Sequence, residues 1–149
     1  GIGAATVRRL AADGAAVAFT YQSSPDAAQD LVDELEASGA KVAAIKADSA
    51  DALAVAAAVD EAVERLGGLD ILVNNAGITS DKPVVSMTDE DWHNVLAVNL
   101  SGAFFISQAA LKHMLERGTG RIINVSSVVG ETGILLQYRA GVQHQKIHP

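Results

Sequence analysis

The side chains in this sequence best placed to do chemistry are the amides of Asn74 and Asn75, which directly follow an apolar run at 69–73. The run holds β-branched residues and comes after two glycines, a pattern typical of a strand buried on both faces of a parallel sheet. Ligands of open α/β sheets lie in the crevice at the carboxyl ends of the strands. We therefore expect a ligand-contacting turn, in which the amides hold polar groups while Ala76 and Gly77 let a flat ring approach closely. A plain strand-ending turn is the alternative for this motif taken alone.

A second candidate site is the stretch Gly1-Ile2-Gly3, which leads directly into a helical pattern. A helix that opens with glycines presents free N–H groups that bind anions, so these residues are a candidate cradle for a diphosphate. A plain helix start explains the two glycines at least as well. The full dinucleotide fingerprint also needs a strand and a further glycine, and both would lie upstream of residue 1.

The elements that would position these two candidate sites are strands that alternate with amphipathic helices along the chain. Ser24 and Thr88 are expected N-caps, and Thr88 with Asp91 resembles a capping box. The alternation predicts an α/β fold, a single domain built on a doubly wound parallel sheet. Aromatic residues make up only 4% of the chain, so the core is expected to consist of Ala, Val, Leu and Ile. Strands are expected at 15–21, 41–47, 69–73 and 121–126, and helices at 4–12, from Pro25 to Gly39, at 51–66 and from Thr88 to about Arg117.

The composition argues against several classes of partner and of chemistry. A formal net charge of −7 disfavours nucleic acid or an anionic membrane surface as a partner. The chain has no cysteine, which rules out disulfides and thiolate catalysis and is compatible with a cytoplasmic location. No apolar run is expected to span a membrane, and no signal-peptide pattern is found.

Four stretches follow one another along the chain: Gly1-Ile2-Gly3, Asn74-Asn75-Ala76-Gly77, Val98-Asn99-Leu100 and the strand from Arg121 to Ser127. Taken in this order, they resemble the motifs of the short-chain dehydrogenase/reductase family over residues 1–133, which implies a Rossmann-like dinucleotide-binding domain. The run at 87–133 most resembles bacterial 3-oxoacyl-[acyl-carrier-protein] reductases, with acetoacetyl-CoA and sugar reductases as close relatives.

The resemblance implies catalytic roles for Asn99, which would anchor a proton-relaying water, and for Ser127 rather than Ser126, which would polarise the substrate carbonyl. The alternatives are a helix-bend asparagine that bonds the backbone and a serine in a strand-end turn. Asp48 falls where the family places an acid against the adenine. No metal is expected. The implied cofactor-binding residues are Gly1, Ile2, Gly3, Tyr21, Ser23, Ser24, Asp48, Ser49, Asn75, Ala76, Gly77 and Val98.

The residues after the second strand favour NADPH over NADH. An acid at the end of that strand would bond the ribose hydroxyls of NAD and repel the extra phosphate of NADP. Here the position holds Tyr21, and no carboxylate follows until Asp26. The hydroxyls and amide of residues 21–24 can instead bond a phosphate. The basic residue that often completes a phosphate site is expected upstream.

The family's Tyr-x-x-x-Lys catalytic pair is missing at its expected positions, which hold Ala140 and His144. Tyr138 and Lys146 are too far apart on a helix to replace the pair. His144 and His148 lack a third metal ligand, so a polar tail is expected. Family character therefore ends before an aberrant tail that starts at about residue 138.

The family's central first strand, expected between the strands ending at Tyr21 and Asn74, is also missing. Two pairs of strands should then face a gap, so the chain is expected to be a fragment of a larger reductase, a partial dinucleotide-binding domain over residues 1–149. The activity that the resemblance implies is NADPH-dependent reduction of a 3-oxoacyl thioester to the 3-hydroxyacyl form in fatty acid synthesis, with a small-molecule or acyl-carrier-protein-bound substrate. The alternatives are a related carbonyl or sugar reductase, a catalytically silent nucleotide-binding subunit, and a translation product without a stable fold. By resemblance, two long helices at 88–117 would form a dimer or tetramer.

Overall fold

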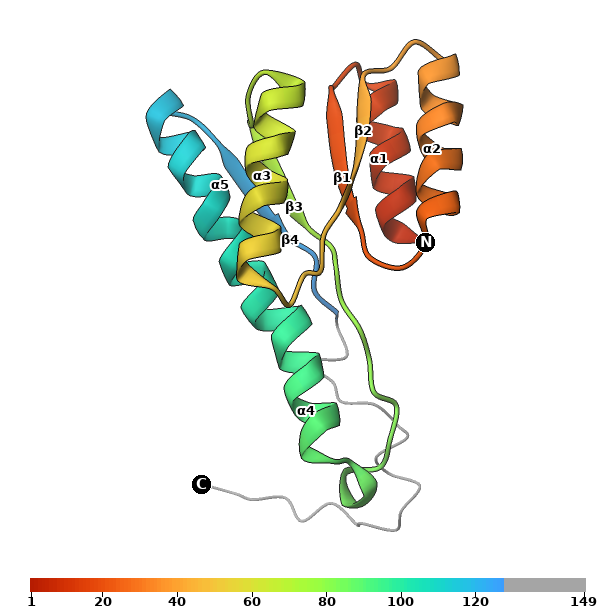
Figure 1. Cartoon of the computed structure of the whole chain (residues 1–149), viewed down its shortest axis with the longest axis vertical. Coiled ribbons are helices and arrows are strands. Elements are labelled where there is room, and N and C mark those ends of the chain that lie inside the picture. Colours follow the sequence, from red (N-terminus) through yellow and green to blue (C-terminus); the bar gives the residue numbers. More distant parts are fainter. Residues whose placement is uncertain (128–149) are drawn as a thin grey trace, which may run out of the picture.

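The computed structural model describes residues 1–127, and its helices and strands alternate along the chain (Figure 1). Each expected strand and helix is present, with ends that differ by a few residues from the prediction. The tail from about residue 138, with Tyr138, Ala140, His144, Lys146 and His148, lies outside the described residues. The elements are α1 (Ile2–Ala12), β1 (Val17–Tyr21), α2 (Pro25–Ala37), β2 (Val42–Lys46), α3 (Ala52–Leu66), β3 (Ile71–Asn74), the 3-10 turn η1 (Val84–Ser86), α4 (Asp89–Leu96), the π segment η2 (Ala97–Gly102), α5 (Ala103–Arg117) and β4 (Arg121–Asn124).

The first half of the fold is a parallel pair, β1 and β2, with helices on both faces. Val17 pairs with Val42 in the ladder, and both are buried against α1 and α2. On the opposite face, Ile45 of β2 packs with Ala58 of α3. Because alternate residues of a strand point to opposite faces, a nearly continuous apolar run can serve both helix layers.

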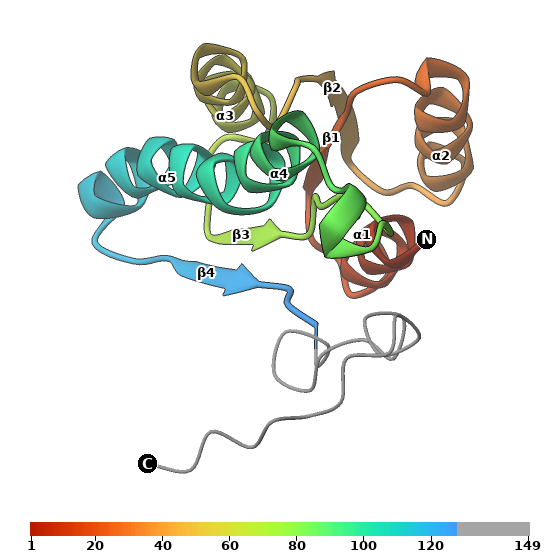
Figure 2. The same cartoon turned by 90° about the horizontal axis from the view of Figure 1, so that it is seen from below.

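The second half is the parallel pair β3 and β4, covered on one face by α3 and α5 (Figure 2). Leu72 packs there with Val59, Met114 and Ala110, and Ala110 is fully buried. The small side chain of Ala110 lets α5 approach closely. Ile123, on β4, remains about half exposed. Within residues 1–127, helices therefore cover both faces of β1–β2 but only one face of β3–β4.

A gap separates the two halves, as the sequence predicts for a sheet without its central strand. The described residues form two two-stranded sheets, and β1 is not hydrogen-bonded to β3. A cavity of about 670 Å³ lies between them, lined by β1, by β3 and by residues of α1 and α3. The facing edges of β1 and β3 thus carry backbone groups without a strand partner among residues 1–127.

The helical region after Thr88 differs from the expected two long helices. It is one continuous helix from Asp89 to Arg117, with the π segment η2 in its middle. The capping box is confirmed, because Asp91 N–H donates to Thr88 Oγ1 and Thr88 N–H donates to the Asp91 carboxylate. Ser24 is the N-cap of α2, but its side chain makes no capping bond.

The length and composition of the helix Asp89–Arg117 would also suit a membrane span, which corrects the expectation that no segment has this character. One such helix is weak evidence, since core helices of globular domains meet the same criteria. Ala109, Ala110 and Met114 of this helix pack against α3 and β3, whereas Leu100, Phe104, Leu111 and Leu115 on the same helix are exposed.

Candidate functional site

The candidate residues gather at the carboxyl ends of the strands, because each pair of strands is parallel and Figure 1 shows both pairs running in the same direction. This edge lies below the strands in Figure 1, next to the start of α1, where the N-terminus is marked. Helix α1 is joined to β1 by a short turn, so it runs back along the strand and returns its first residues to this edge. Parallel topology alone therefore brings Gly1 close to the ends of β1 and β3.

The start of α1 packs directly against the turn after β3. A Cβ added at Gly3 would lie 2.9 Å from Nδ2 of Asn75, closer than real Cβ atoms approach. A residue larger than glycine at position 3 would therefore force the side-chain amide of Asn75 to shift. The structure thus brings together the two motifs that the sequence identifies as candidate cofactor sites.

Asn74 joins the end of β3 to β4 and α5. Its side-chain amide donates to Oδ1 of Asn124 at 2.7 Å and to Oγ of Ser107 at 3.0 Å. The ladder continues beyond the two strands, because Val125 N–H donates to the Asn74 carbonyl at 2.9 Å. These bonds fix the register of β4 against β3, and with it the backbone that leads to Ser127.

Asn99 lies on the π segment η2 and holds the loop that follows Gly77. Its Oδ1 accepts a hydrogen bond from Ile78 N–H at 2.8 Å, and its Nδ2 donates to the Ile78 carbonyl at 2.9 Å. The side chain of Asn99 therefore bonds the backbone of a loop 21 positions away, and its catalytic role stays a prediction. Because both bonds go to the backbone of one residue, on either side of its Cα, Asn99 fixes the path of the loop from Gly77 onward. A π segment is a frequent feature of functional sites in helices.

Lys82 is a residue of the loop after the site whose ion pair sequence reasoning missed. Its ammonium group contacts both carboxylate oxygens of Asp91 at 2.7 Å, and so ties the 78–87 loop to the first turn of α4. The hydrogen bond from Lys82, together with those from Thr88, holds the pKa of Asp91 well below its usual range. The capping box is the sequence signal that could have indicated this ion pair, because it fixes the carboxylate of Asp91 in place.

Gly102, which ends η2, is a second residue that the sequence did not single out. It is buried, and a Cβ added there would overlap the carbonyl oxygen of Ser49 and lie 3.2 Å from its carbonyl carbon. The missing side chain thus lets the long helix touch the turn between β2 and α3. Ser49 is one of the residues expected to contact the cofactor.

Gly102→Ala is therefore expected to destabilise the fold by roughly 1–3 kcal/mol, the usual cost of overpacking. Backbone atoms of Ser49 cannot move aside as a flexible side chain would. Thermal unfolding followed by circular dichroism measures the effect. Gly1→Ala is the matched control, since a Cβ there meets nothing within 4 Å. Equal melting temperatures for the two variants would contradict the close packing of Gly102.

About half of the expected site residues line the one cavity described above. Asp48 lies outside it and accepts a hydrogen bond from Ala50 N–H at 2.9 Å, which shapes its turn. Ser127 lies just beyond β4 and is exposed. No group of three metal-ligating side chains is found within residues 1–127. The cavity-lining members of the expected set are Gly3, Tyr21, Ser24, Ser49, Asn75, Ala76 and Val98, whereas Gly1, Ile2, Ser23, Asp48, Gly77, Asn99 and Ser127 do not line it.

Comparison with known proteins identifies the family. The family model described as short chain dehydrogenase matches residues 1–139. The chain belongs to this family. Its α/β fold with parallel strands is the fold of the solved members it matches.

Members of the family with curated names share much of the sequence. The 3-oxoacyl-[acyl-carrier-protein] reductase FabG of Staphylococcus aureus is 44% identical over 133 residues, which are 89% of this chain and 54% of the reductase. The 3-oxoacyl-[acyl-carrier-protein] reductase of Synechocystis is 41% identical over the same length. The chain therefore spans about half the length of the curated relatives it matches.

A solved structure shows the same arrangement with a cofactor bound. The short chain dehydrogenase from Burkholderia cenocepacia, solved in complex with NADP, is 44% identical and superposes with a TM-score of 0.84. The match covers 94% of this chain and 58% of that protein. That protein binds NADP with a fold that this chain shares over its described part.

Proposed function

We propose that the full-length protein uses NADPH to reduce a 3-oxoacyl thioester, carried on acyl-carrier protein, to the 3-hydroxyacyl form. The observation that carries this proposal is the 44% identity to the Staphylococcus aureus FabG reductase over 133 residues. The 41% identity to a reductase of the same name from Synechocystis supports it. A related carbonyl or sugar reductase and a silent nucleotide-binding subunit remain the competing functions.

The residues at the carboxyl edge fit a dinucleotide. Gly3 leaves open a close approach that a Cβ would fill, and the first backbone N–H groups of α1 lie beside Asn75. Free N–H groups at a helix start suit a diphosphate. Ala76 and Gly77 leave room for a flat ring, with Val98 at the same edge, while Asp48 and Ser49 would hold the adenine end.

The proposed chemistry divides between the cofactor and the protein. NADPH, when bound, supplies the hydride. Ser127 would donate a hydrogen bond to the substrate carbonyl and so stabilise the negative charge that develops on its oxygen. Asn99, through Ile78, would keep the 77–78 backbone in place and anchor a water in the proton relay. The proton donor belongs to the part of the protein outside residues 1–127.

The direct test is an assay of the purified full-length protein with acetoacetyl thioesters of acyl-carrier protein and of CoA. We expect NADPH oxidation that depends on the thioester and is faster with the carrier-protein substrate. Turnover only with CoA thioesters or with sugars would favour the related reductases. Tight NADPH binding without turnover of any carbonyl would establish the silent nucleotide-binding subunit instead.

A further inference from the structure

The carboxyl end of β2 carries a lysine without a partner. Nearly all described lysines and arginines make a hydrogen bond or an ion pair, for example Arg8 with Glu34 and Arg117 with Asp70. Within residues 1–127, only Lys46 and Lys112 make neither. Lys112 lies on α5, whereas Lys46 lies at the edge that holds the candidate cofactor residues.

The register of the first sheet places Lys46 beside Tyr21. The two residues are direct partners in the parallel ladder, so their side chains project from the same face, on strands about 4.8 Å apart. Two steps earlier on that face, Phe19 pairs with Ala44, and both pack against the core under α1 and α2. Tyr21 and Lys46 therefore continue this face to the carboxyl edge, where it opens to solvent.

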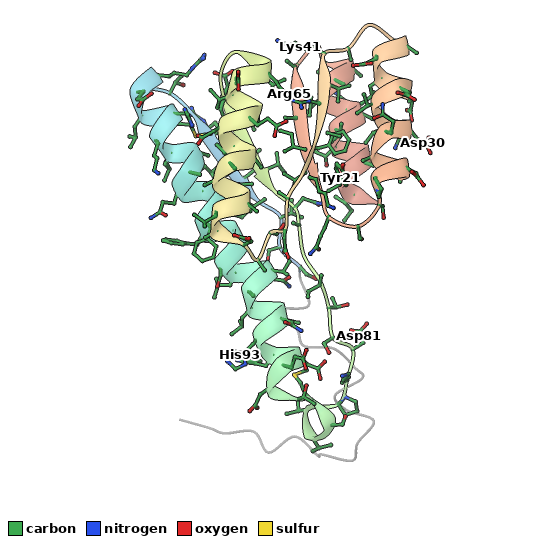
Figure 3. The ribbon with its side chains drawn as sticks, in the orientation of Figure 1. Tyr21, Asp30, Lys41, Arg65, Asp81 and His93 are labelled. Atoms are coloured by element: carbon green, nitrogen blue, oxygen red, sulfur yellow. The ribbon has the colours of Figure 1, made fainter. Side chains whose placement is uncertain are left out.

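The two ends of β2 use their lysines differently. Lys41, just before the strand, donates to the Leu66 carbonyl at 3.3 Å and so satisfies the end of α3. Figure 3 shows Lys41 at the upper end of the strand pair and Tyr21 at the opposite, carboxyl end. Lys46 is exposed at the end marked by Tyr21, and no acid among the described residues pairs with it.

We infer that Lys46 supplies the positive charge that selects the 2′-phosphate of NADPH, an inference that rests on the proposed cofactor site. The hydroxyl and amide groups of residues 21–24 can bond a phosphate, but they carry no charge to offset it. The acids near this edge, Asp26 and Asp48, would repel a dianion. A charge-assisted bond from an ammonium group offsets that repulsion and is absent for the 2′-hydroxyl of NADH. Lys46 would thus be the basic residue of the phosphate site, which the sequence predicts upstream of residue 1.

The test measures dissociation constants for NADPH and NADH by fluorescence titration of the full-length protein and of three variants. Lys46→Met is expected to weaken NADPH binding at least tenfold and to leave NADH binding within about twofold. Lys46→Arg keeps the charge and should retain most of the preference. Lys112→Met removes an equally unpaired lysine far from this edge, so it controls for net charge and should change neither constant.

Competition with adenosine 2′,5′-bisphosphate and with 5′-ADP repeats the measurement without the nicotinamide. Only the bisphosphate should lose affinity in Lys46→Met. Equal losses for both cofactors, or an unchanged NADPH constant, would overturn the inference even when the wild-type protein reduces thioesters. If Lys46→Met selectively loses NADPH binding but the wild-type protein reduces no carbonyl, the role of Lys46 in NADPH selection is supported and the proposed reaction is rejected.

Discussion

Ser127→Ala in the full-length protein is expected to lower kcat for thioester reduction by about 10²- to 10³-fold, the usual cost of removing one donor to a developing oxyanion. The reason is positional. The Asn74–Asn124 bond and the bond from Val125 N–H to the Asn74 carbonyl fix the end of β4 beside the turn Asn75-Ala76-Gly77. In the proposed reaction, the substrate carbonyl would lie at that turn to receive the hydride. The NADPH dissociation constant should stay unchanged, because Ser127 is expected to contact the substrate carbonyl and is not one of the residues expected to hold the cofactor.

Ser126→Ala is the matched control for this prediction. Ser126 and Ser127 are adjacent, exposed residues of the same type, so Ser126→Ala removes the same hydroxyl group one position earlier in the chain. Steady-state kinetics with saturating NADPH should show near-normal kcat for Ser126→Ala. A large loss in Ser126→Ala with normal turnover in Ser127→Ala would place the catalytic hydroxyl one residue earlier.

Local patterns predicted the elements well because each rests on contacts close in sequence. The helical spacing of Ala28, Leu31, Val32 and Leu35 predicts the buried face of α2, and these four are the residues that the structure buries there. The capping box at Thr88 is likewise complete within one helical turn. Such features need no knowledge of the tertiary fold.

The features that the sequence did not reveal depend on contacts between distant segments. Asn99 bonds Ile78 across 21 positions, and the close approach of Gly102 to Ser49 joins η2 to the turn after β2. The role inferred for Lys46 depends on its pairing with Tyr21 in the sheet, which the sequence alone does not show. Ser24 is a local exception, since it is the N-cap of α2 but its side chain makes no capping bond. The site-residue roles themselves stay predictions until the kinetic tests are done.

The largest stability effect is expected from filling the gap between β1 and β3. A chain that carries an apolar, β-branched segment of about six residues ahead of Gly1 should be more stable than residues 1–149 alone, by on the order of 5 kcal/mol. Each of the two facing edges gains a ladder of hydrogen bonds worth about 1 kcal/mol apiece. At about 2–4 °C per kcal/mol for a domain of this size, the melting temperature should rise by roughly 10–20 °C.

The direction of the added segment follows from α1. Because α1 starts at the carboxyl edge, beside Asn75, a strand that leads into Gly1 must end there and so run parallel to both β1 and β3. The matched control is a segment of the same length with a central proline, which removes a ladder donor and should lose most of the gain. Hydrogen exchange adds a local measure, since the amides of Val17–Tyr21 and Ile71–Asn74 that face the gap should become protected only with the unbroken segment. Equal melting temperatures for both segments would mean that the cavity is not a strand site, and that apolar contact alone accounts for any stabilisation.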